Sequence, residues 1–144
     1  MKKFTLIAIA MGGLLLVFLF QKVSYAEWWN RIAPEAINIE SSNIAFIVNK
    51  TIRLILNDAF CMLLIWSLFE NRSYLRVAFF LFLIEIGVVL PLYFLFKLWL
   101  EGPTEISSPL LSQIHRMVVN PLLMFLLIAG LIYQRAITRL NSQQ

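Results

Sequence analysis

Several polar residues of this chain lie inside or beside long apolar stretches. Their side chains are of types that could bind a ligand or transfer a proton. Ionisable groups in hydrocarbon are costly, so they pair, face a wet cavity or mark a proton or ion path. Asp58 and Glu85 could take up and release a proton, and His115 is the single histidine. The full set of candidate residues is Arg53, Asn57, Asp58, Glu85, Glu101, Glu105, His115, Arg116 and Asn120.

Two pairs of these residues have the spacing that places side chains on one helix face. Arg53 and Asn57 are four apart, as are Arg116 and Asn120, and such residues are neighbours on a helix. We expect both pairs to meet in the outer half of a membrane, with Asp58 facing Arg53 or Arg116. An unpaired ion costs about 2.5–3.5 kcal/mol near a helix centre. The alternative is a set of interhelical bonds worth about 0.6 kcal/mol each.

Cys61, His115 and the arginines are also the residue types of a cysteine transpeptidase, which needs a thiolate, a base and a cation. Cys61 lies about ten residues, or roughly 15 Å, below the outer end of its apolar stretch, whereas His115 is at the surface. A nucleophile and its base must be within about 3 Å. We therefore expect Cys61 to be a small buried hydrophobe, and a single cysteine excludes cysteine zinc sites and CxxC pairs. No catalytic residue, metal or cofactor is predicted.

The composition identifies the solvent of these residues. The 144 residues are 60% hydrophobic and 14% charged, with a mean hydropathy of +0.81, against about 45–50% and 25% in soluble domains. The twelve Lys and Arg are scattered between apolar runs, which indicates membrane flanks and argues against nucleic acid as a partner. Because a membrane helix needs about 20 apolar residues, the chain is long enough for four in one domain.

We predict an all-α membrane protein, a bundle of four transmembrane helices at about 4–20, 52–69, 77–100 and 117–133. Between the first two, tryptophans, a proline and charges are mixed, as is typical of an interfacial segment. The first stretch could instead be a signal peptide, since Ser24-Tyr25-Ala26 resembles a cleavage site. Its apolar run exceeds the usual ~7–15 residues, which favours a retained anchor.

Two prolines fall inside the predicted helices. Pro91 and Pro121 each remove a backbone donor, so we expect a kink at both. Ser108 followed by Pro109 is typical of an N-cap and first helical position. The last helix should therefore start outside the membrane.

The distribution of cations predicts that both termini are cytoplasmic, because cytoplasmic segments are enriched in Lys and Arg. The segments that would then face inward hold one acid, Glu70, and six cations: Lys2, Lys3, Arg72, Arg76, Arg135 and Arg139. The outward segments hold four cations and five acids: Lys22, Arg31, Lys50, Arg116, Glu27, Glu35, Glu40, Glu101 and Glu105.

The chain resembles a small family of bacterial membrane proteins, the exosortase F system-associated proteins, within residues 49–135. The matching stretches are NKTIRLILNDAFCMLLIWSLFENRSYLR and EGPTEISSPLLSQIHRMVVNPLLMFLLIAGLIYQR. The features that carry the resemblance are Arg53 with Asn57-Asp58, Glu101-Gly102, Glu105, Ser107-Ser108-Pro109, His115-Arg116, Asn120-Pro121 and Tyr133-Gln134. Ala129-Gly130 departs from the proline expected there.

The resemblance implies a role beside an exosortase, a multispanning enzyme that resembles a sortase and cleaves C-terminal sorting signals. It implies no reaction for the chain itself. We expect a non-enzymatic accessory subunit of the bacterial inner membrane that assists the sortase-like enzyme or its substrate, with lipids and an exosortase-type membrane protein as partners. The alternative is a small carrier or enzyme that uses Asp58, Glu85 and His115 for proton or substrate handling. A water-filled cavity at Glu85 would favour the carrier, and a dry bundle with an exposed groove would favour the subunit.

The orientation can be tested by labelling intact cells with a membrane-impermeant thiol reagent in a Cys61→Ala background. Ser112→Cys should be labelled and Ser73→Cys protected, because the first is predicted to face outward and the second inward. Labelling in the reverse pattern would overturn the orientation.

Overall fold

The computed structural model describes residues 2–34, 38–102 and 109–141, and the regular elements in these ranges are helices. The expected all-α fold is confirmed, whereas Glu105 and Ser108 lie outside the described residues. The elements are α1 (Lys2–Leu19), α2 (Tyr25–Ile32), α3 (Ser42–Phe69), α4 (Arg72–Ile84), a π-helical turn η2 (Glu85–Val89), α5 (Leu90–Leu100), α6 (Pro109–Val119) and α7 (Leu122–Asn141).

Three helices are long and apolar enough to cross a membrane: α3, the continuous helix formed by α4, η2 and α5, and α7. They indicate a multi-pass membrane protein. Helix α1 is apolar but shorter. The second span was expected from residue 52, yet α3 already begins at Ser42, so the predicted interfacial segment is replaced in part by helix. Its other part forms the short helix α2.

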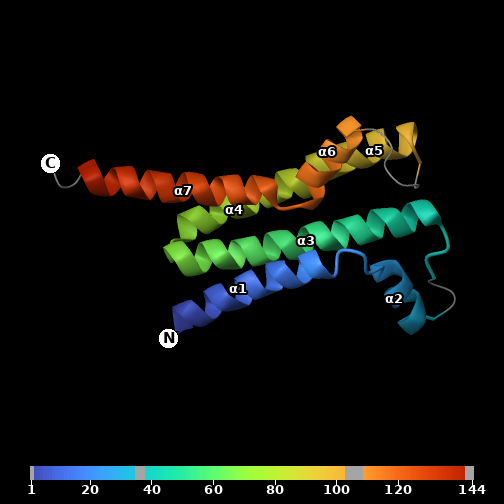
Figure 1. Cartoon of the computed structure of the whole chain (residues 1–144), viewed down its shortest axis with the longest axis horizontal. Coiled ribbons are helices and arrows are strands. Elements are labelled where there is room, and N and C mark those ends of the chain that lie inside the picture. Colours follow the sequence, from blue (N-terminus) through green and yellow to red (C-terminus); the bar gives the residue numbers. More distant parts are fainter. Residues whose placement is uncertain (1, 35–37, 103–108, 142–144) are drawn as a thin grey trace.

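Helix α3 lies in the middle of the molecule, with α1 along one side and α4 and α7 along the other (Figure 1). The first turn of α1, the last turn of α7 and the connection between α3 and α4 lie at one end, which we call the terminal end. Helices α2 and α6 lie at the other end, which we call the polar end. The start of α1 and the end of α7 therefore lie at the same end of the molecule.

The tight connection at the terminal end follows from its residues. Glu70 ends α3 in the left-handed conformation, at φ 52°, and its N–H donates to the carbonyl of Trp66 at 2.9 Å. The side chain of Asn71 then caps α4 by accepting from the N–H of Ser73 at 2.8 Å. Lys3 pairs with Glu70 at 3.2 Å, so α1 is also connected to this turn.

The two prolines have different effects. At Pro121 the helix is broken, since α6 ends at Val119 and α7 begins at Leu122, so the irregularity expected there is present. At Pro91 the helix continues to Leu100, and η2 ends at Val89, two residues before the proline. The N–H of Leu90 donates to the carbonyl of Glu85, the longer bond of a π turn.

Small residues allow α1 to lie close to α3. Ala10 and Val17 are buried, and a Cβ at Gly13 would overlap the ring of Phe60. Close approach at small residues is how membrane helices gain packing energy where the hydrophobic effect is weak. Ala10 belongs to the main core, together with Cys61, Leu64, Ile65, Ala78, Met124, Ile128 and Leu131.

We predict that Gly13→Leu destabilises the protein by about 1–3 kcal/mol, because the added side chain overpacks the contact between α1 and α3. Gly12→Leu is the matched control, since a Cβ at Gly12 meets nothing within 4 Å, and both changes remove a helical glycine. Thermal unfolding in detergent measures the difference. Equal unfolding temperatures for the two variants would contradict the packing assigned to Gly13.

Candidate functional site

Arg53 joins three segments at the polar end. It is 8% exposed, and its guanidinium donates to the side-chain oxygens of Gln21 at 3.3 Å and Asn120 at 3.1 Å. Gln21 follows α1, and Asn120 lies in the break between α6 and α7. The expected meeting of Arg53 with Asn120 is therefore confirmed. The Nε atom of Arg53 is buried and has no hydrogen-bond partner.

A cavity of about 400 Å³ opens beside this arginine, and we call it the cationic cavity. Its lining contains two arginines, a histidine and two amides: Phe18, Gln21, Arg53, His115, Arg116 and Asn120. Four of the candidate residues predicted from the sequence thus share one site. Among the described residues that line it, none is acidic, so the cavity complements an anion.

His115 contributes to the cavity as a neutral ring. Burial, together with the nearby cations Lys50, Arg53, Lys97 and Arg116, lowers the pKa of His115 to about 4. Its Nδ1 lies 2.6 Å from the hydroxyl of Tyr93 on α5. When Tyr93 donates to Nδ1, the ring proton is on Nε2, which is then a donor.

Lys97 and Glu101 form a separate buried pair that the sequence analysis missed. Lys97 is 0% exposed, and its Nζ lies 3.1 Å from both a carboxylate oxygen of Glu101 and the carbonyl of Gly102. The ring of Phe46 is 6.0 Å away. The four-residue spacing of Lys97 and Glu101 is the sequence signal that could have found this pair. Glu101 therefore belongs to this pair, not to the lining of the cationic cavity.

Asp58 pairs with Glu85, so its predicted pairing with Arg53 or Arg116 is wrong. The two side chains are 1% and 5% exposed and hydrogen-bond to each other. The reason is angular: at 3.6 residues per turn, Asp58 points about 140° away from Arg53 on α3. It faces η2, whereas Arg53 faces α1 and the break at Asn120.

The two carboxyl groups must hold at least one proton between them. Ionised carboxylates are acceptors only, so the hydrogen bond between Asp58 and Glu85 needs a proton on one of them. Asp58 Oδ2 and Glu85 Oε2 are buried without a hydrogen-bond partner. We call Asp58 and Glu85 the carboxyl pair.

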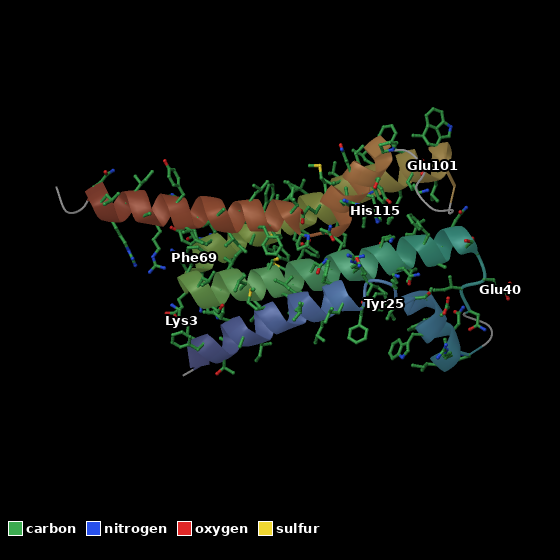
Figure 2. All side chains as sticks on the ribbon, viewed as in Figure 1. Lys3, Tyr25, Glu40, Phe69, Glu101 and His115 are labelled. Atoms are coloured by element: carbon green, nitrogen blue, oxygen red, sulfur yellow. The ribbon has the colours of Figure 1, made fainter. Side chains whose placement is uncertain are left out.

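The polar side chains that line the cationic cavity lie apart from the side chains of the apolar core. Figure 2 shows His115 and Glu101 at the end of the molecule away from Lys3 and Phe69. Cys61 is fully buried in the apolar core, and the structure does not bring it to His115. Asn57 is buried and lines an apolar cavity next to the cationic one. Within 2–34, 38–102 and 109–141, no three His, Cys, Asp or Glu side chains are grouped for a metal ion.

Comparisons with protein-family models, with curated proteins and with solved structures find no match to this chain.

The shared proton of the carboxyl pair predicts that the protein tolerates an amide in place of the Asp58 carboxyl group. Asp58→Asn should change stability by less than about 1 kcal/mol, because an amide can replace a protonated carboxyl as the partner of Glu85. Asp58→Leu should cost about 1–3 kcal/mol, because Glu85 then loses its partner. Thermal unfolding of both variants in detergent measures this. A loss of about 3–5 kcal/mol in Asp58→Asn would instead indicate a broken ion pair.

Proposed function

We propose that the protein is a non-enzymatic accessory subunit of an exosortase system, which binds an exosortase-type protein within the bacterial inner membrane. The observation that carries this proposal is an open apolar groove of about 800 Å³ between α3 and α4. We call this groove the partner groove. It is lined by Ala59, Met62, Leu63, Trp66, Arg72, Leu75, Arg76 and Phe79.

The burial of the long helices supports docking within the membrane. Helix α3 buries 44% of its most apolar 18 residues within the chain, whereas the α4 to α5 helix and α7 bury 17% each. Lipid can cover a convex apolar face, but a concave one is filled best by side chains that interdigitate with it. The partner groove is concave, apolar along its length and bordered by Arg72 and Arg76, so we infer that it receives a transmembrane helix.

In this proposal α1 is the fourth crossing, and both termini are cytoplasmic. Helix α1 has 18 residues, which at 1.5 Å per residue is roughly 27 Å, close to the ~30 Å hydrocarbon core. The terminal end carries the cationic flanks expected of the cytoplasmic side: Lys3, Arg72, Arg76, Arg135 and Arg139.

The alternative role as a proton or substrate carrier has less support. A carrier needs a water path to its ionisable groups, yet the cavities described here are not lined by Asp58 or Glu85. His115 lines the cationic cavity and hydrogen-bonds to Tyr93, so it is not part of the carboxyl pair. This arrangement favours a subunit over a carrier.

The proposal is tested by purifying the tagged protein from native membranes in mild detergent and identifying what accompanies it. An exosortase-type protein should co-purify with the wild type, and Ala59→Trp should reduce its recovery about tenfold or more, which is 1.4 kcal/mol of binding free energy. Ala59 is exposed in the partner groove, so the larger side chain fills the groove without entering the core.

Leu126→Trp is the control, because Leu126 is exposed on α7 and does not line the partner groove. It should retain the partner. Recovery of the exosortase-type protein with Ala59→Trp at the control level would reject the groove as the docking site, and its absence from the wild-type preparation would reject the accessory role.

A further inference from the structure

The cationic cavity continues into a second, apolar hollow. Phe18, Arg53 and Asn120 line both. The second hollow, of about 300 Å³, is otherwise lined almost wholly by apolar side chains of α1 and of the segment that begins α7; we call it the apolar furrow. Its remaining lining residues are Met11, Leu14, Leu15, Asn57, Pro121 and Phe125. The cationic cavity and the apolar furrow are thus joined end to end.

Among the described residues that line the cationic cavity, no acidic side chain balances its two arginines. Arg53 is nine-tenths buried, its guanidinium donates to the neutral amides of Gln21 and Asn120, and its Nε is without a partner. A buried guanidinium without a counter-charge is costly. Arg116 adds a second cation to the same lining, and guanidinium groups match the geometry of phosphate oxygens.

The position of the cationic cavity in the fold indicates that it lies near the bilayer surface. Gln21 follows the end of α1 by two residues, so the cavity lies where an α1 span would leave the hydrocarbon. Trp28 and Trp29 of α2 are exposed at the same polar end, and tryptophan is enriched at the level of lipid head groups. The apolar furrow extends from there toward Met11, into the depth of an acyl chain.

We propose that the cationic cavity and the apolar furrow together bind one anionic phospholipid. The phosphate of its head group lies between Arg53 and Arg116, with the Nε2 of His115 as a neutral donor, and an acyl chain lies along α1 and α7 in the furrow. This site is independent of the proposed docking of an exosortase-type protein, because the partner groove shares none of its lining residues.

The test measures binding of three probes to the full-length protein in neutral detergent: phosphatidylglycerol, phosphatidylcholine and inorganic phosphate. Phosphatidylglycerol should bind at least about tenfold more tightly than phosphatidylcholine, because it carries a net negative charge. Inorganic phosphate should bind much more weakly than the lipid, because it places nothing in the furrow. Equal affinity for the two lipids, or phosphate binding as tight as phosphatidylglycerol, would overturn the proposal.

Variants at exposed positions separate the two halves of the site while leaving the core unchanged. Arg116→Gln should weaken phosphatidylglycerol binding about tenfold, whereas Arg139→Gln, an equal loss of charge at the terminal end, should leave it unchanged. Leu15→Trp, which fills the furrow, should weaken lipid binding without changing phosphate binding. Equal effects of the two arginine variants, or unchanged lipid affinity in Leu15→Trp, would show that the lipid does not occupy this site.

Discussion

The buried polar side chains of α3 constrain where its neighbours lie. A polar group in an apolar interior must be hydrogen-bonded, because leaving it unpaired costs several times what a bond contributes. Arg53 has acceptors only if α1 ends beside it and Asn120 reaches it from the opposite side. Asp58 has a partner only if Glu85 faces it. These requirements fix three neighbouring segments around one helix.

The π turn η2 lets the long helix formed by α4, η2 and α5 keep its buried residues against α3 along its whole length. The buried residues Ala78 and Glu85 are seven apart, as are Leu90 and Lys97, so each pair forms its own stripe. Glu85 and Leu90 are five apart, which in a regular α-helix is a rotation of about 140°. The π turn accommodates one extra residue and brings both stripes onto the face that packs against α3. Glu85 and the buried Lys97 thus lie on the same side of this helix.

The sequence predicted the helices and part of the site for a physical reason. Hydropathy locates apolar segments, and four-residue spacing locates a helix face, so the meeting of Arg53 with Asn120 could be foreseen. Spacing does not say which neighbour lies against a face, and this is why the partner of Asp58 was predicted wrongly. The early start of α3 at Ser42 was missed because its first turns hold Asn43, Asn49 and Lys50, which lower the hydropathy without ending the helix. No residue pattern in the sequence predicted the π turn.

Helix α3 also separates the two surfaces to which we assign binding. Asn57 borders the apolar furrow and Ala59 borders the partner groove, and two residues along a helix correspond to a rotation of about 200°. The furrow lies against α1 and α7, whereas the groove lies against α4. A lipid in the first therefore leaves the second open, and the same holds in reverse. The two occupants would share α3 as a wall and would not touch each other, so each surface can be filled or empty without blocking the other.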